Sequence, residues 1–208
     1  MSKLRLRHDL LHCAIGADAV CLDLSQNRYF LFAREGAAAL RAAADGSANE
    51  TQLEWLAQKG FIEVGEIENS KAAAAIPVES VYDDRFPRVS AALVLESLFW
   101  HSRARRWLAT QSLGALLSPN GLPYGDVERY REIAASFARA SRYRDTTDQC
   151  LARGLAMRAM LARRNLGCNL VVGVTLPFAA HCWIQVDGLV ISDPLDLVLN
   201  YRPLHSVR

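Results

Sequence analysis

The stretch from Thr147 to Pro194 constrains the fold most, because it joins one helical pattern to three β-rich runs through short turns. From Cys150 onward the residues are mostly Leu, Ala, Met and Arg, which favour helix, and we expect that helix to stop at Gly167. The β-rich runs are Asn169–Thr175, Ala180–Val186 and Leu189–Asp193. A helix followed by a strand meander predicts an α+β fold with an antiparallel sheet.

Cys150 occupies the first turn of the expected helix, a position that favours a reactive sulfur. Thr147 and Asp148 precede it, and both residue types are good N-caps. The unpaired backbone N–H groups and the positive dipole end of a helix N-terminus stabilise a thiolate relative to a thiol. The sequence therefore predicts an activated nucleophile at Cys150.

The turn between the last two β-rich runs decides whether His181 and Asp193 share a face of the sheet. The dipeptide Asp187-Gly188 marks that turn. If the turn has two residues, the alternation of side chains puts His181 and Asp193 on opposite faces. If it has three, with Gly188 in the left-handed position of a bulge, His181 stands directly across from Asp193. We predict the three-residue loop.

On that register, three side chains converge in the roles of a catalytic triad. Cys150 is the predicted nucleophile, His181 the base, and Asp193 the residue that orients the imidazole. Asp187 and Asp196 are alternatives for the third position. Both rank lower, because Asp187 belongs to the turn and Asp196 lies beyond a proline.

The five cysteines are scattered along the chain, at positions 13, 21, 150, 168 and 182, without C-x-x-C spacing. This pattern argues against a disulfide framework and fits a protein of the reducing cytoplasm. A zinc site built from Cys168, His181 and Cys182 is disfavoured, because adjacent strand residues point to opposite faces. We therefore expect no metal and no cofactor.

Three motifs occur in order in the last third of the chain: C-L-A-R-G-L-A-M-R-A-M-L, then G-C-N-L-V-V-G-V, then F-A-A-H-C-W-I-Q-V-D-G-L-V-I-S-D. Together they resemble the transglutaminase-like, papain-like cysteine protease domain of lasso-peptide biosynthesis B proteins, the microcin-processing leader peptidases. The resemblance implies that Cys150 is the nucleophile, His181 the base and Asp193 the third member. That family often has Ala or Ser where Cys182 follows the histidine here.

The function implied by the resemblance is removal of the leader peptide from a ribosomally made lasso-peptide precursor, a step of antibiotic biosynthesis. The precursor and an ATP-dependent lasso cyclase would then be the partners. Two other functions stay open from the residues alone. One is acyl transfer to an amine, as in a transglutaminase or amidase, and the other is a non-catalytic peptide-binding or DNA-binding module.

The first 80 residues predict a small module of three strands, two helices and a wing strand. The expected ranges are Leu10–Ile15, Ala19–Leu24 and Tyr29–Phe32 for the strands, Ala37–Ala44 and Thr51–Lys59 for the helices, and Phe61–Val64 for the wing. The motifs C-L-D-L-S-Q-N-R-Y-F-L-F and L-A-Q-K-G-F-I-E resemble the winged-helix-like peptide-recognition element of ribosomal peptide-modifying systems. The helix that this element has between the two is reduced or missing at Ser47–Glu50.

This second resemblance implies that an extended leader peptide adds as a strand to an exposed sheet edge. The residues expected to contact it are Tyr29, Phe30, Leu31, Phe32, Leu53 and Leu56. The alternative for the aromatic residues among them is that they simply fill a core.

A linker is expected over Glu66–Pro87, with the domain boundary near residue 80. This divides the chain into a recognition element, residues 1–80, and a protease domain, residues 81–208. The protease domain opens with a helical segment, in which helices are expected over Val89–Trp107, up to Leu117, and from Asp126 to Arg142.

Charge and hydropathy exclude several classes of partner. The net charge of +2 is too small to indicate nucleic-acid binding, although residues 81–208 carry 16 basic and 11 acidic side chains. The start of the chain, M-S-K-L-R-L-R-H-D, lacks the apolar run of a signal peptide. The most apolar run, Val89–Trp100, contains Glu96 and is too short to span a bilayer. We expect a soluble cytoplasmic protein that binds no membrane.

Overall fold

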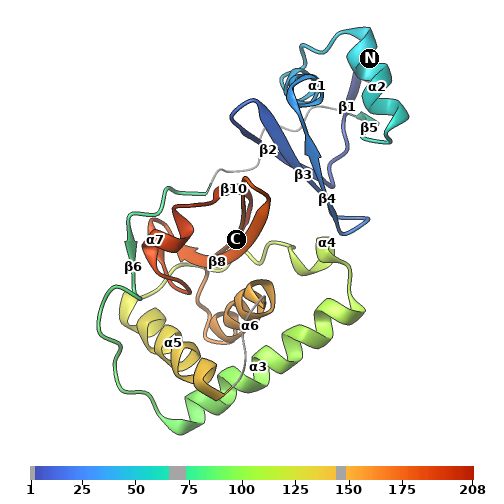
Figure 1. The fold of residues 1–208 in the computed structure, drawn as a ribbon. Helices are drawn as coiled ribbons and strands as arrows, with labels where there is room; N and C mark the ends of the chain where they lie inside the picture. Colours follow the sequence, from blue (N-terminus) through green and yellow to red (C-terminus); the bar gives the residue numbers. More distant parts are fainter. Residues whose placement is uncertain (1–2, 66–73, 144–148) are drawn as a thin grey trace. The chain divides into compact units, whose positions relative to one another are not determined.

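The computed structural model describes residues 3–65, 74–143 and 149–208 of the 208-residue chain. It divides the chain into two compact units, Met1–Ala72 and Ala73–Arg208 (Figure 1). Both units mix helices with mostly antiparallel strands, as the sequence predicts. The boundary expected near residue 80 lies a few residues inside the second unit, because Glu79–Ser80 forms a strand of the second unit's sheet.

The first unit holds a three-stranded antiparallel sheet in the order β2-β3-β4, a two-stranded sheet of β1 and β5, and two helices. Its elements are β1 Lys3–Leu6, β2 Leu10–Ile15, β3 Asp18–Asp23, β4 Arg28–Phe32, α1 Arg34–Ala44, α2 Glu50–Gln58 and β5 Ile62–Gly65. The expected wing strand is β5, but it pairs with β1, a strand that the sequence analysis did not foresee.

The start of α2 is fixed by a capping box. The side chain of Asn49 accepts a hydrogen bond from the backbone N–H of Gln52, and the side chain of Gln52 accepts one from the backbone N–H of Asn49. Residues 45–49 between α1 and α2 form no helix, in agreement with the missing helix expected there. Inward-facing residues of β3, α1 and α2, together with Phe61, form the core of this unit.

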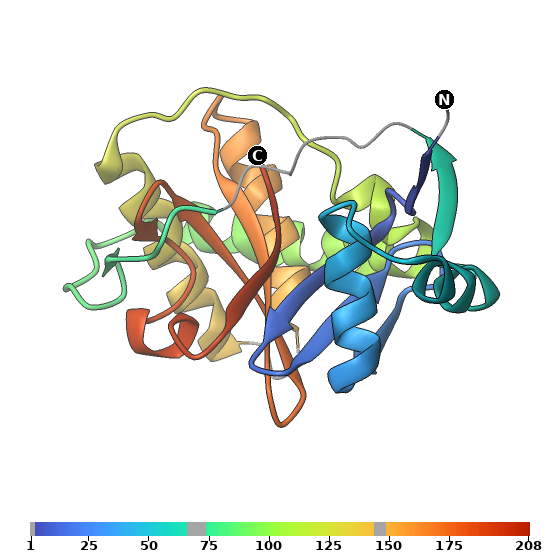
Figure 2. The ribbon, with the colours of Figure 1, turned by 90° about the horizontal axis from the view of Figure 1, so that it is seen from above.

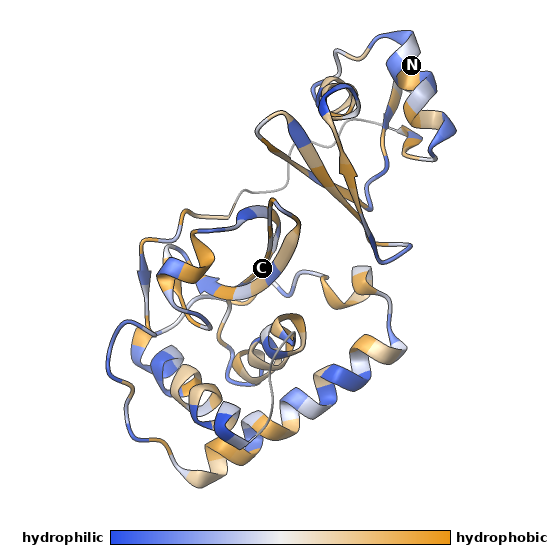
Figure 3. Ribbon diagram, viewed as in Figure 1, coloured by the Kyte–Doolittle hydropathy of each residue, from blue (hydrophilic) through white to orange (hydrophobic). Residues whose placement is uncertain are grey.

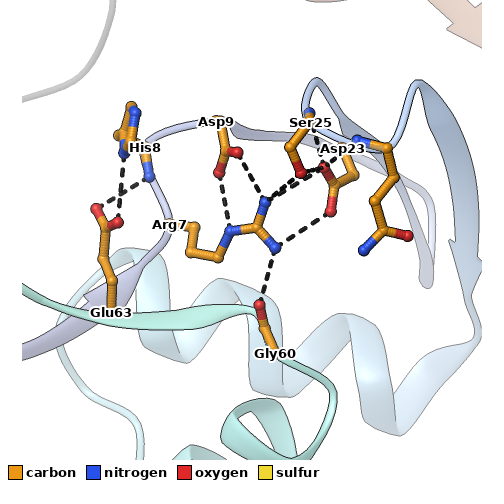
Figure 4. Close-up of polar contacts among 8 residues, drawn as sticks. Arg7, His8, Asp9, Asp23, Ser25, Gly60 and Glu63 are labelled. Atoms are coloured by element: carbon orange, nitrogen blue, oxygen red, sulfur yellow. Dashed lines mark hydrogen bonds and ion pairs between the residues drawn. The ribbon is translucent and has the colours of Figure 1, made fainter.

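Arg7 ties three segments of the first unit together (Figure 4). Its guanidinium donates two hydrogen bonds to the carboxylate of Asp9, at 2.9 and 2.7 Å, and a third to the carbonyl oxygen of Gly60 at 3.0 Å. It also lies 3.3 Å from the fully buried carboxylate of Asp23. Burial raises the pKa of Asp23, but hydrogen bonds from Ser25 and the charge of Arg7 lower it below its ordinary value. This network fixes the strand ends relative to the loop after α2.

The second unit is built around a five-stranded sheet in the order β10-β7-β8-β9-β6. Its elements are β6 Glu79–Ser80, α3 Ala91–Thr110, α4 Leu113–Leu116, α5 Val127–Ala140, α6 Cys150–Ala162, β7 Asn169–Thr175, β8 Ala179–Val186, β9 Leu189–Val190, α7 Leu195–Val198 and β10 Arg202–Val207, with a 3₁₀ turn at Ser141–Tyr143. In Figure 2 the orange β7–β8 hairpin runs beside the red β10. The sheet is not purely antiparallel, because β6, which falls in the expected linker, pairs with β9 in parallel.

Helix α6 lies between the sheet and the helices α3 and α5 (Figure 1). Ser90 caps α3 and Asp126 caps α5, each through a side-chain oxygen that accepts a backbone N–H. The surface of α5 carries both hydrophilic and hydrophobic colour in Figure 3, and its buried residues include Tyr130, Ile133 and Phe137. Among the helices in the described ranges, none is both long enough and apolar enough to cross a bilayer.

The helix α6 begins at Cys150, as expected, and it is shorter than expected. Thr147 and Asp148, the expected N-cap residues, lie outside the described residues, and Gln149 directly precedes the helix. The helix ends at Ala162 rather than at Gly167. Asn165 adopts a left-handed backbone with φ of 56°, a conformation that asparagine tolerates better than most residues.

The turn between β8 and β9 has two residues, so the prediction of a three-residue loop is wrong. Val186 pairs with Leu189, and Asp187 rather than Gly188 takes the left-handed backbone, with φ of 49°. The alternation rule would then separate His181 from Asp193. It does not apply, because β9 contains only two residues and the chain bends away from the sheet before it reaches Asp193.

The serine at position 192 accounts for the early end of β9. The Ser192 hydroxyl accepts the backbone N–H of Ile184 at 2.8 Å, where a continuing β9 would have offered a carbonyl oxygen. Because of this bend, β9 does not pair with the part of β8 that runs from Ile184 back toward His181. Asp193 can therefore turn toward His181 from outside the ladder.

Candidate active site

The thiol of Cys150 occupies the part of the β8 edge that β9 leaves uncovered. Backbone N–H groups of Leu151, in the same helix, and of Cys182, on β8, hydrogen-bond the sulfur. Burial raises the pKa of Cys150, but the hydrogen bond and charge of His181, with these two N–H groups, lower it below the ordinary thiol value. The site therefore favours a thiolate.

A glycine lets α6 approach the sheet at this point. A Cβ atom added to Gly154 would lie 3.1 Å from the sulfur of Cys182, so alanine fits there only if that thiol rotates, and any larger residue would crowd the helix against β8. Glycine inside a helix costs about 1 kcal/mol relative to alanine. The close packing positions the first turn of α6 against the strand that carries His181.

His181 lies between the thiol and a buried carboxylate. Its Nε2 lies 3.2 Å from Oδ1 of Asp193, as an ion pair rather than a well-aligned hydrogen bond, which leaves Nδ1 as the nitrogen that can exchange a proton with Cys150. Burial lowers the pKa of His181, but its interactions with Asp193 and Cys150 raise it to about 9. The rings of Tyr201 and Trp183 flank the imidazole, with centroid distances of 5.2 and 6.4 Å.

Asp193 is almost completely buried, with 2% of its surface exposed. Ser192 donates a hydrogen bond to Oδ2, Arg153 pairs with Oδ1, and Ser80 donates to the backbone carbonyl oxygen at 2.6 Å. Burial raises the pKa of Asp193, but the interaction with His181 and the charge of Arg153 lower it below its ordinary value. The carboxylate is therefore ionised at neutral pH.

The structure thus brings Cys150, His181 and Asp193 together, although through a different register from the expected one. The lowered thiol pKa and the raised imidazole pKa both favour a thiolate–imidazolium pair over the neutral thiol and imidazole. Such a pair can attack a carbonyl carbon and then supply a proton to the leaving group. The alternative third members lie elsewhere, with Asp187 exposed in the turn and Asp196 exposed in α7.

Three residues that contact Asp193 were not foreseen from the sequence: Arg153, Ser192 and Ser80. Of these three, only Arg153 could have been found from its position in the sequence. It lies three residues after Cys150, and residues at that spacing share one face of a helix.

No group of three or more His, Cys, Asp or Glu side chains in the described ranges is arranged to hold a metal ion.

The residues expected to bind a leader peptide occupy different environments in the first unit. Tyr29 and Leu31 on β4 are 36% and 55% exposed, whereas Phe30 and Phe32 pack against the core. Leu53 is half-buried and Leu56 is fully buried in the core. Strand β4 is an edge strand among the described residues, since β3 is its one neighbour in the sheet.

Comparison with known proteins identifies the family of the second unit. The family model described as the transglutaminase-like superfamily matches residues 91–206, which is more than half of the chain. The chain belongs to the transglutaminase-like superfamily. The matched range runs from α3 to β10 and contains Cys150, His181 and Asp193. No solved structure matches the chain.

A segment of the chain is also similar to the microcin J25-processing protein McjB of Escherichia coli, with 44% identity over 45 residues. That segment covers 21% of this chain and 22% of McjB. The match thus spans about a fifth of each protein.

Proposed function

We propose that this protein is a cysteine peptidase that removes the leader peptide from a ribosomally made lasso-peptide precursor. The observation that carries the proposal is the arrangement of Cys150 at the start of α6, with its thiol against His181 and His181 against the buried carboxylate of Asp193. Membership of the transglutaminase-like superfamily and the similarity to a microcin-processing protein support it.

In the proposed reaction, the Cys150 thiolate attacks the carbonyl carbon of the peptide bond, and the carbonyl π electrons move to oxygen. Collapse of this intermediate breaks the C–N bond, and the His181 imidazolium gives its proton to the departing amine, which leaves a thioester. The neutral imidazole then takes a proton from water as the water attacks the thioester. The carboxylic acid is released and the thiolate–imidazolium pair returns. Asp193 holds the imidazole oriented and stabilises its positive charge throughout.

The first unit is proposed to hold the leader at the edge of β4 that pairs with no other strand in the described ranges. An extended peptide would add there as a fourth strand, with its backbone hydrogen-bonded to β4 and its side chains beside the exposed Tyr29 and Leu31. A leader held in this way makes cleavage effectively intramolecular, so the active site itself needs little affinity for the precursor. The remaining partner in this proposal is an ATP-dependent lasso cyclase, which closes the ring of the released core peptide.

The test is to mix the purified chain with a synthetic lasso-peptide precursor, leader and core together, and to measure the masses of the products. The proposal expects two fragments whose summed mass exceeds the precursor by one water. Cys150→Ala should abolish them, whereas Cys168→Ala, which changes a buried cysteine remote from the thiolate chemistry, should retain cleavage.

Two results would change the assignment. A product that couples the peptide to an added amine, without gain of water, would indicate acyl transfer instead of hydrolysis. Cleavage that persists in Cys150→Ala would contradict the proposal.

A further inference from the structure

One oxygen atom of the Asp193 carboxylate contacts two basic side chains. Oδ1 lies 3.2 Å from Nε2 of His181, and the same oxygen pairs with Nη2 of Arg153. We propose that Arg153 is a positioning residue of this site, which holds Asp193 against His181 and sets the balance of charge around the thiol. This proposal rests on the proposed function in that it concerns the same site, but the reactivity of the thiol can be measured without any precursor peptide.

The place of Arg153 in α6 carries the proposal. Arg153 lies one helical turn after Cys150, so both side chains leave the same face of the helix. The Arg153 side chain is 20% exposed and its partner Asp193 only 2%, so solvent screens the pair weakly. One helix therefore supplies both the nucleophile and the cation that pairs with the third member of the site.

Arg153 completes a set of contacts that fixes Asp193, two of them to its carboxylate and one to its backbone. Arg153 holds Oδ1 from α6, Ser192 holds Oδ2 from the neighbouring position, and Ser80 holds the backbone carbonyl from β6. A carboxylate held at both oxygens cannot rotate away from His181.

The charge of Arg153 has a second effect on the site. A lone buried aspartate would stabilise the imidazolium strongly, which would slow transfer of its proton to a leaving amine. The nearby guanidinium offsets part of the negative charge of Asp193 and also favours the thiolate of Cys150.

Two further titratable groups face this cluster, and both are neutral at working pH. Tyr82, which follows β6, lies near Arg153 and Asp193, and burial raises the pKa of its hydroxyl to about 12. Burial also raises the pKa of Cys182, on β8, well above that of an ordinary thiol. The charges that compete around His181 are therefore those of Arg153, Asp193 and Cys150.

The variant that isolates this role is Arg153→Met, which removes the charge and keeps an unbranched side chain. Loss of the guanidinium withdraws support from the thiolate, so the pKa of Cys150 should rise. It also leaves Oδ1 of Asp193 to His181 alone, so the pKa of the imidazolium should rise as well. The pH profile of Cys150 reactivity should have two limbs, one set by the pKa of Cys150 and the other by the pKa of His181. Both limbs should move upward by about one pH unit in this variant.

The measurement is the rate of Cys150 alkylation by iodoacetamide across pH, read from the mass of the peptide that contains Cys150, together with an NMR titration of His181. Arg153→Lys keeps the positive charge and should restore both limbs to within a few tenths of a pH unit of wild type. Arg164→Met is the matched control. It removes an arginine that follows the same helix and pairs with Glu96 at 2.7 Å, and it should leave the limbs unchanged.

Limbs that stay in place or move downward in Arg153→Met would overturn the proposal and leave Arg153 a structural role only. If the methionine variant does not fold, Arg153→Gln, which keeps a hydrogen-bond donor without the charge, carries the same expected shift. Failure of the proposed function looks different. In that case wild type would leave the precursor uncut while the alkylation limbs still responded to Arg153.

Discussion

Each unit of this protein buries one aspartate beside an arginine, and the two pairs differ in what else they touch. In the first unit, Asp23 accepts hydrogen bonds from the backbone and hydroxyl of Ser25 and lies beside Arg7, which also pairs with Asp9 (Figure 4). None of these partners changes its charge near neutral pH. In the second unit, Asp193 lies beside Arg153 and also beside His181.

The comparison separates a structural ion pair from a chemical one. A buried carboxylate needs a cation and hydrogen bonds wherever it occurs, so the Arg–Asp pair by itself indicates no chemistry. What distinguishes Asp193 is a titratable ring on one side, with a thiol beyond that ring. The pKa of His181 is raised to about 9 and that of Cys150 is lowered, so protons can move within the site. Three predictions, ordered by the size of the expected effect, test this distinction.

The largest expected effect is that of His181→Asn. Without an imidazole, the thiolate loses its charge partner and the leaving amine loses its proton donor, so the cleavage rate should fall by about 10⁴-fold or more. Rates of product formation under saturating precursor provide the measurement. His8→Asn, which changes an exposed histidine paired with Glu63 in the first unit, is the control and should cleave at the wild-type rate. A His181→Asn variant with near-normal rates would remove the histidine from the chemistry.

The second prediction sets the two aspartates against each other. Asp193→Asn should lower the cleavage rate by about 10²- to 10⁴-fold, because the imidazolium loses its counterion, and should also destabilise the fold by about 3–5 kcal/mol, because Arg153 stays buried without a partner. Asp23→Asn should cost about 1–3 kcal/mol of stability and leave the rate per folded molecule unchanged. Urea unfolding and cleavage assays on both variants measure these quantities. If Asp193→Asn and Asp23→Asn lost the same cleavage rate per folded molecule, Asp193 would have no chemical role beyond that of Asp23.

The third and smaller effect concerns Gly173, which pairs with His181 across β7 and β8. A Cβ there would lie 2.5 Å from the Trp183 ring and 2.9 Å from Cβ of Tyr201, so Gly173→Ala must displace the rings that flank the imidazole. We expect a stability loss of about 1–3 kcal/mol and a few-fold lower cleavage rate.

Gly154→Ala serves as the comparison for Gly173→Ala. Its Cβ would first meet the rotatable thiol of Cys182, and alanine favours the helix, so its stability should be near that of wild type. If Gly173→Ala were as stable as Gly154→Ala, the rings would not be packed as tightly as the structure shows.

The parts of the fold that the sequence predicts well are those with strong local patterns. The bounds of β7 match the expected strand, and those of β8 differ by one residue, because both runs are rich in β-branched and aromatic residues. Asp126 precedes a helix that begins at the next residue, as predicted, whereas Ser90 caps a helix that was expected to begin at Val89. The helix start at Cys150 was predicted from Thr147 and Asp148, but Gln149 directly precedes the helix and its side chain makes no capping hydrogen bond.

The parts that the sequence analysis missed depend on distant partners. Strands β6 and β10 carry weak patterns of their own and exist because β9 and β7 pair with them. The register at Asp187 was wrong because Asp187 itself takes the left-handed backbone in a two-residue turn. The early end of β9, where the Ser192 hydroxyl bonds Ile184 on the neighbouring strand, was missed as well. Arg153 was missed for the same reason, since its partner Asp193 lies 40 residues away in the sequence.

The pH dependence of Cys150 alkylation in wild type and in His181→Asn tests the central claim most directly, because it needs no substrate. The account predicts that wild-type Cys150 reacts as a thiolate below the pKa of about 8.5 of an ordinary thiol, and that its reactivity changes again near pH 9, where the imidazolium loses its proton. In His181→Asn the first limb should move upward and the second should vanish. A wild-type profile with one limb at or above the ordinary thiol pKa, unchanged by the substitution, would contradict the account.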